Sequence, residues 1–228
     1  MRSCLILLSA ICLALAGAAN GSVKKGEIEL EVFGGLSIEN GAAQGDDQDS
    51  ILAGAAGADL DGWFASAGIG CFFSNNFQLG VAGFGSWLSG SETARLVPEP
   101  AFPTAVAVYD VDIDAVVYGV GGRAKWHFAP KKSMVPYVGV QVFWATADID
   151  VSGTAEIVID GEGTGPSDID ESDSDNGILW GPIVGVRLQL GERDEVFFEY
   201  QYHLWSGSIG DILDDGHAIS LGLAHRLK

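Results

Sequence analysis

A histidine and a serine lie close together at residues 203 and 206 of this 228-residue chain. A serine hydroxyl becomes a nucleophile when a base such as histidine lies within hydrogen-bond reach. Residues 196 to 204 alternate between apolar and polar, as a strand does, and successive side chains of a strand point to opposite faces. His203 shares a face with Glu199 and Gln201, whereas Ser206 has the other parity. The pattern therefore predicts no catalytic site here.

Metal and cofactor sites are also not indicated. The run from Asp168 to Asn176 is acidic, but it lacks the D-x-D-x-D-G spacing and the glutamate at position twelve that a calcium-binding EF-hand requires. No Cys/His spacing of a zinc site occurs. No glycine-rich phosphate loop follows a strand and opens a helix. We expect no catalytic residue, no metal and no cofactor.

The composition narrows the class of protein. Hydrophobic residues make up 47% of the chain, aromatic residues 10%, and there are 32 glycines. The 12 basic and 31 acidic residues give a net charge of -19, which excludes nucleic acid as the main partner because phosphate must be neutralised by Lys and Arg. The apolar and aromatic content also excludes disorder throughout.

The first residues have the pattern of an export signal. Met1, Arg2 and Ser3 carry one positive charge, an apolar run follows to Leu15, and residues 16–18 are small. A short apolar run of this kind with a small-residue cleavage site predicts a secretory signal peptide over residues 1–19. The domain then covers residues 20–228. Only Cys71 would remain, so an internal disulfide is not expected.

The rest of the chain shows alternation of period two, which predicts strands. In the best of these segments one face is aliphatic or aromatic, and the other carries glycine, small or charged residues. Eight segments follow this pattern: 27–32, 62–73, 77–87, 116–128, 137–146, 177–190, 196–204 and 219–227.

The connections between these strands alternate in length. Short ones cover 74–76, 129–134 and 191–194, and long ones cover 38–61, 88–112, 147–176 and 206–216. Short turns on one side and long loops on the other are typical of outer-membrane barrels, as are aromatic girdles at both membrane interfaces. The aromatic residues predicted at the interface are Trp63, Trp87, Trp126, Trp144 and Trp180. The sequence thus predicts an all-β fold, an eight-stranded antiparallel transmembrane barrel with up-and-down connections.

The charged residues with inward parity balance each other. They are Glu27, Glu29, Glu31, Arg123, Lys125, Arg187, Glu199 and Arg226. The interior of an eight-stranded barrel is about wide enough for side chains to fill it. One interpretation is a packed ionic network that closes the lumen; the other is a gated ion pathway. Counting outward from the turn at 191–194 predicts that Arg187 and Glu199 face each other on neighbouring strands.

The last two strands resemble those of the small outer-membrane barrels of the OmpA and OmpX type. The aromatic alternation of residues 197–203 is followed by a loop and by the closing run Ser220-Leu221-Gly222-Leu223. Many members end on an aromatic residue that the assembly machinery reads, whereas this chain ends on Leu227 and Lys228. The resemblance implies insertion by the barrel-assembly machinery, and it specifies no function.

Together these patterns predict a protein of the outer membrane of a Gram-negative-type bacterium. Its expected partners are outer-membrane lipid and lipopolysaccharide, the assembly machinery, and an unidentified extracellular ligand of the acidic loops. The favoured role is structural or adhesion-like, without enzymatic activity. The alternatives are a narrow channel for ions or small solutes and a lipid-modifying enzyme, since some lipid A-deacylating barrels place a His and a Ser close together.

Overall fold

The computed structural model describes residues 24–41, 59–96, 105–128, 133–159, 162–211 and 213–227. The predicted signal peptide, residues 1–19, lies outside these ranges. Within them no helix is long and apolar enough to cross a membrane. The described chain is mostly strand, and it includes a short 3-10 helix, η1 (Ser208–Asp211).

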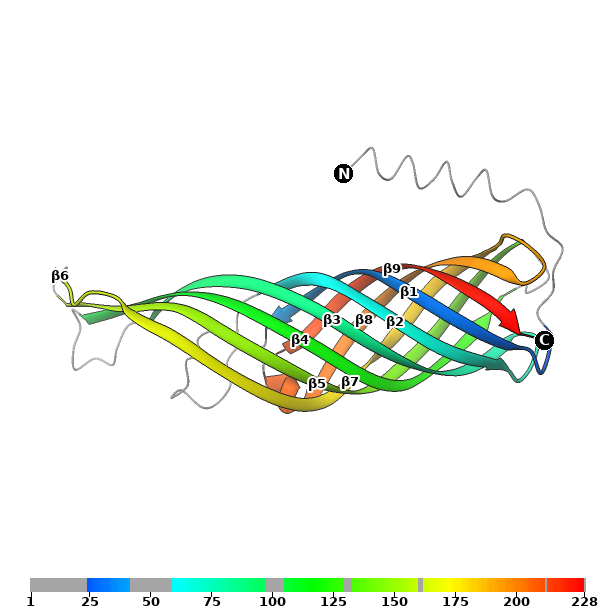
Figure 1. Ribbon diagram of the computed structural model, residues 1–228, viewed down its shortest axis with the longest axis horizontal. Coiled ribbons are helices and arrows are strands. Elements are labelled where there is room, and N and C mark those ends of the chain that lie inside the picture. Colours follow the sequence, from blue (N-terminus) through cyan, green and yellow to red (C-terminus); the bar gives the residue numbers. More distant parts are fainter. Residues whose placement is uncertain are drawn as a thin grey trace, which may run out of the picture.

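Long antiparallel strands follow one another around a closed barrel (Figure 1). Each pairs with the next along the chain, and β9 closes the ring against β1. A short strand, β6, pairs only with the far end of β5. The eight-stranded meander predicted from the sequence is therefore confirmed. The strands are β1 (Ile28–Gly41), β2 (Leu60–Phe72), β3 (Phe77–Leu96), β4 (Ala105–His127), β5 (Met134–Ile159), β6 (Glu162–Gly163), β7 (Ser167–Gln189), β8 (Asp194–Gly207) and β9 (Leu213–Leu227).

The two ends of the barrel differ. Short connections join β2 to β3, β4 to β5 and β7 to β8 at one end, where β1 also begins and β9 ends (Figure 1). The backbone closes these turns directly: Leu190 N donates to Asp194 O at 2.9 Å, and Phe73 N donates to Phe77 O at 2.9 Å. We call this end the turn end and the opposite end the loop end. In outer-membrane barrels the short turns lie on the periplasmic side and the longer loops outside the cell.

Two connections that the sequence predicts as long loops are largely strand. Residues 88–96 continue β3 and 105–112 open β4, while 147–159 extend β5 and 167–176 open β7. Smaller parts of the predicted loops 38–61 and 206–216 also belong to strands. The sequence prediction was wrong here because the acidity of these segments was taken for a solvated loop. They form paired strands instead, in which the acids of β4 and β5 occupy the outward face and those of β7 occupy both faces.

The two faces of β4 exchange their character near residue 116. From Val116 toward the turn end, outward side chains such as Tyr118 and Val120 are apolar and exposed. Before Val116 the outward positions are Asp110, Asp112 and Asp114, and the inward positions are Val111, Ile113 and Ala115, none more than 5% exposed. β5 changes in the same way between Trp144 and Asp148. An apolar outer face suits lipid and an acidic outer face suits water, so the exchange marks where the wall leaves the membrane.

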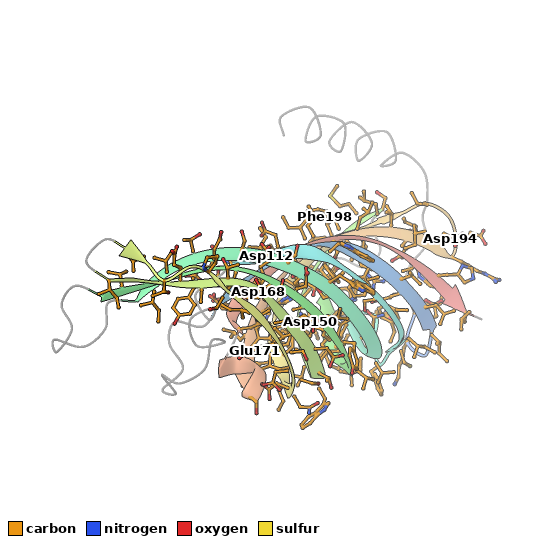
Figure 2. All side chains as sticks on the ribbon, turned by 60° about the vertical axis from the view of Figure 1, so that its left-hand side comes forward. Asp112, Asp150, Asp168, Glu171, Asp194 and Phe198 are labelled. Atoms are coloured by element: carbon orange, nitrogen blue, oxygen red, sulfur yellow. The ribbon has the colours of Figure 1, made fainter. Side chains whose placement is uncertain are left out.

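Beyond this level β3, β4, β5 and β7 continue as a projecting sheet. β2 accompanies β3 only up to the pair Asp61–Ser89, and β8 accompanies β7 only from the pair Gly177–Gly207. Figure 2 shows Asp112, Asp150, Asp168 and Glu171 along this extension, at the far side from Asp194. Among the described residues, the fold is thus a membrane barrel whose wall is prolonged on one side into a four-stranded, acid-faced sheet.

Replacing residues 152–170 by an Asn-Gly turn should leave the barrel able to fold. The cut follows the register, since Ser152 pairs with Asp170, and the next pair, Val151–Glu171, can be joined by a two-residue hairpin. The removed segment lies outside the lipid-facing wall. We expect the shortened protein in detergent to keep a gel mobility that changes on boiling. The same mobility before and after boiling, with unaltered protein shifting normally, would show that the extension is needed for folding.

Candidate functional site

The turn-end half of the barrel interior holds a buried layer of charged side chains centred on Arg187 of β7. Its Nη1 donates to Glu29 Oε1 at 2.6 Å and Oε2 at 2.8 Å, and its Nη2 donates to Glu31 Oε1 at 2.5 Å. Both glutamates lie on β1, across the lumen from β7. Arg187 is 1% exposed and Glu29 is 0% exposed, so this charge-assisted contact is shielded from solvent.

A second part of the same layer joins β4 to β8. Arg123 donates to Glu199 through Nη2 and lies 3.4 Å from Glu31 Oε2. Lys125 Nζ lies 2.8 Å from Glu31 Oε2 and 3.6 Å from Glu199 Oε2. Tyr137 of β5 donates its hydroxyl proton to Glu199 Oε2 at 2.8 Å. Glu31 therefore bridges the two parts, because it contacts cations from both β4 and β7.

The absence of a side chain at Gly185 of β7 makes room for the ring of Tyr137. A Cβ on Gly185 would lie 2.4 Å from Tyr137 Cζ and 2.5 Å from its hydroxyl oxygen. Gly185 is paired directly with Glu199 in the sheet. A larger residue at Gly185 would displace the ring and remove its hydrogen bond to Glu199.

The layer ends near the turns with Arg226 of β9. Arg226 pairs with Glu195 through Nη2, and its Nη1 lies 3.9 Å from Glu27 Oε2. Glu195 also lies 3.2 Å from Arg187 Nη1. Sequence reasoning missed Glu195 because it directly follows the turn, although it shares the inward parity of Glu199.

The predicted direct pair of Arg187 and Glu199 is wrong in register. Arg187 is opposite Phe197, and Glu199 is opposite Gly185. The turn between β7 and β8 is tighter than assumed, because Leu190 N already bonds to Asp194 O. The error is an even number of residues, so both side chains still point inward but meet different partners.

All eight predicted lumen charges lie in this layer or at its turn-end margin. Four carboxylates (Glu29, Glu31, Glu195, Glu199) face four cations (Arg123, Lys125, Arg187, Arg226), so the buried part of the layer is neutral. Aromatic rings add contacts to the cations: Arg123 lies 4.5 Å from the ring centre of Phe33, and Lys125 lies 5.2 Å from that of Phe197.

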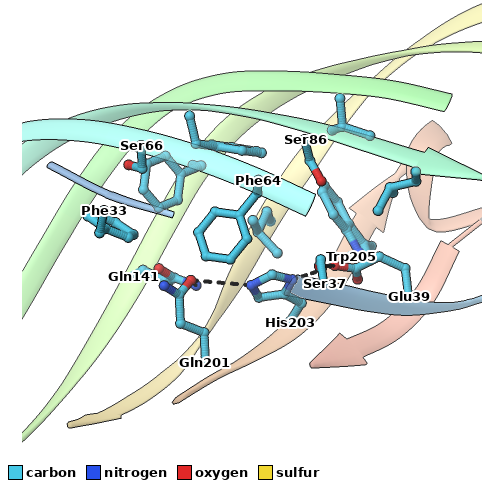
Figure 3. A pocket seen from close by; sticks show the side chains of 15 residues that line it. Phe33, Ser37, Glu39, Phe64, Ser66, Ser86, Gln141, Gln201, His203 and Trp205 are labelled. Atoms are coloured by element: carbon cyan, nitrogen blue, oxygen red, sulfur yellow. Dashed lines mark hydrogen bonds and ion pairs between the residues drawn. The ribbon is translucent and has the colours of Figure 1, made fainter. Parts of the chain in front are cut away.

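On the loop-end side of the ions lies a small cavity lined by both apolar and polar side chains (Figure 3). His203 Nδ1 lies 2.6 Å from Glu39 Oε1, and its Nε2 lies 3.3 Å from Gln201 Oε1. Trp205 donates its indole N–H to Glu39 Oε2 at 2.9 Å, and the Ser37 hydroxyl donates to Oε1 at 2.5 Å. The cavity measures about 20 Å³, which is room for about one water molecule.

Apolar side chains fill the loop end of the barrel interior. They come from several strands and from η1, and they include Leu60, Leu88, Val117, Phe143, Leu179, Trp205, Ile209 and Leu213. From the turn end to the loop end, the interior thus consists of the ionic layer, a cavity with room for about one water molecule, and an apolar plug.

The five predicted interface tryptophans all point outward and are 41–61% exposed. Trp126 lies near the turn end, opposite Phe77. Trp87 lies toward the loop end, in β3, and stacks on Trp63 with ring centres 4.1 Å apart. Trp144 of β5 and Trp180 of β7 lie two positions apart in the register, since Trp144 is opposite Ile178. A tilted strand of about 9–11 residues spans the hydrocarbon layer, so these rings suit its two boundaries.

The remaining sequence candidates do not form a reactive site. Ser206 donates to the Ile178 carbonyl at 3.3 Å on the outer face, whereas His203 lies buried in the interior. The serine and histidine thus lie on opposite sides of the wall. In the part of the chain that the structure describes, no group of three or more His, Cys, Asp or Glu residues could hold a metal ion.

Arg187→Ala should destabilise the barrel by about 3–5 kcal/mol, because Glu29 is left buried without its cation. Combining it with Glu29→Ala should cost clearly less than the sum of the single changes. Combining it with Glu199→Ala should come closer to the sum, since these two side chains share neighbours but no direct contact. Urea unfolding in detergent measures these values. A larger coupling for Arg187 with Glu199 than with Glu29 would contradict the observed register.

Solved structures of small outer-membrane barrels are similar in fold. The chain is 13% identical to Neisserial surface protein A, with a TM-score of 0.47 and coverage of 88% of this chain and 97% of that chain. It is 13% identical to the attachment invasion locus protein Ail of Yersinia pestis, with a TM-score of 0.42 and coverage of 89% of this chain and 99% of that chain. It is 12% identical to OprG of Pseudomonas aeruginosa, with a TM-score of 0.42 and coverage of 92% of this chain and 99% of that chain.

Comparison with curated protein sequences gave no match. The sequence does match a family described as the outer membrane protein beta-barrel domain, over residues 5–226. That match spans nearly the whole chain and agrees with the closed ring of strands, the apolar outer band and the ionic interior. The chain therefore belongs to the outer membrane protein β-barrel domain family.

Proposed function

We propose that this protein is a non-conducting, non-enzymatic barrel of the outer membrane that presents its projecting acidic sheet to partners outside the cell. The observation that carries the proposal is the filled interior. A neutral layer of paired ions and an apolar plug occupy the path that a solute would have to take. A pore needs a hydrated passage, and eight strands leave room for little beyond side chains.

The projecting sheet supports the surface role. Its outward face carries Asp110, Asp112 and Asp114 on β4 and Asp148 and Asp150 on β5. Asp114 and Asp150 are directly opposite each other, an arrangement that is unfavourable in an isolated sheet. A cationic partner would relieve this repulsion, and the summed negative potential would attract such a partner from a distance.

Conductance of the refolded protein tests the closed interior. In a planar bilayer we expect no discrete current steps, because the buried ions are paired with each other. A porin refolded in the same way provides the positive control, and the boiling-dependent gel shift verifies that the protein is folded. Reproducible ion-selective steps would contradict the proposal and favour the narrow channel.

Binding of a fluorescent oligolysine peptide to protein in nanodiscs tests the acidic face. Changing Asp110, Asp112 and Asp114 to Asn should weaken binding about tenfold, since three exposed charge contacts of roughly 0.5 kcal/mol each are lost. Binding should also weaken as salt rises. The matched control neutralises Glu192 and Asp194 at the turn end. Equal loss per removed charge in the two variants would show that only net charge matters and that the sheet has no binding role.

A further inference from the structure

The lipid-facing wall is hollowed over β2 and β3. Adjacent outward positions there carry the smallest residues: Ala65 is paired with Gly85, and Ala67 is paired with Gly83. Neighbouring outward positions carry larger side chains. The result is an open groove of about 720 Å³ on the outside of the barrel. β2 and β3 lie side by side in the middle of the wall in Figure 1.

Larger side chains enclose this groove along the strands. The stacked rings of Trp63 and Trp87 lie two residues further toward the loop end, and the pair Ile69–Val81 lies two residues further toward the turn end. Trp87 leans over the groove, because a Cβ on Gly85 would lie 3.2 Å from Trp87 Cη2. The floor of the groove is therefore made of small residues, with two tryptophan rings at its loop-end side.

Neighbouring strands supply the sides. Val32 of β1 is paired with Ala67, and Val120 and Tyr118 of β4 are paired with Gly83 and Gly85. Trp144 of β5 continues this side, and no charged side chain lines the groove. A straight apolar chain lying in it would contact the small residues of β2 and β3 and the larger side chains of β1 and β4 beside them.

The position of the groove identifies its environment. Trp63 and Trp87 lie at the loop-end aromatic level, and the groove begins directly below them on the lipid-facing side. Aromatic rings at this level sit at the membrane–water interface. The loop end faces outward from the cell. The groove therefore opens into the hydrocarbon of the outer leaflet. In an outer membrane this leaflet is made of lipopolysaccharide.

We propose that this groove binds one acyl chain of a lipopolysaccharide molecule. Elsewhere on the wall, side chains such as Leu30 and Val140 project outward, 43% and 56% exposed, so a chain beside them is contacted along one side. A chain in the groove is contacted on three sides, so its apolar burial is greater. The bound molecule should persist when other lipids are exchanged for detergent.

The test is native mass spectrometry of protein extracted in mild detergent from outer membranes. Gly83→Leu fills the groove without backbone strain, since the nearest atom to its new Cβ is Gly119 O at 3.6 Å. Gly122→Leu is the matched control: it adds the same side chain to the outer face of β4 outside the groove, with Gly80 O at 3.8 Å. Ala67→Leu fills the groove from β2 and provides a second variant if Gly83→Leu does not fold.

We expect unaltered protein and Gly122→Leu to retain one lipopolysaccharide per chain, and the groove-filling variants to lose it. Because the unaltered protein is measured directly, failure of both variants to fold does not rescue the proposal. It is overturned if the unaltered protein carries no lipid, or carries phospholipid instead. It is also overturned if folded Gly83→Leu keeps its lipopolysaccharide, or if the unaltered protein is a dimer that Gly83→Leu separates, which would assign the groove to a second copy.

Discussion

Hydrocarbon offers no partner to a backbone N–H or C=O group, and the rest of the structure depends on this constraint. A sheet in the bilayer must close on itself, and its outward side chains must be apolar. Among the residues that the structure describes, the charges within the membrane band are therefore directed inward, into a space too narrow for bulk water. There the charges must neutralise each other, as the four carboxylates and four cations around Arg187 do.

The ionic layer connects strands that are far apart in the sequence. Arg187 and Glu29 are separated by 158 residues, and Glu31 bridges cations on β4 and β7. Buried ion pairs contribute little net stability compared with apolar packing, because both groups must be desolvated. They do penalise alternative registers strongly, since a shift of β1 would leave Glu29 and Glu31 without cations. We infer that the layer fixes how the barrel closes.

Sequence patterns predicted the inward and outward faces well, because the period of two depends only on residue parity. They could not fix the register across the β7–β8 turn, because a shift by an even number of residues preserves parity. The predicted partner of Arg187 was Glu199, whereas the structure pairs it with Glu29. They also misassigned residues 147–159 and 167–176, because Asp and Ser on an exposed strand face have the composition of a loop. The Glu39–His203 contact joins β1 to β8 across the lumen, which no local pattern can reveal.

The outer face of β4 changes from lipid-facing to water-facing between Val116 and Asp114. Spin labels placed singly at 112, 114, 118 and 120 in bilayer-embedded protein measure this directly through their collisions with oxygen and with a water-soluble nickel complex. The structure predicts nickel access at 112 and 114, and oxygen access with nickel exclusion at 118 and 120. Oxygen-rich, nickel-excluded labels at 112 and 114 would place the acidic strands inside the bilayer and contradict the account.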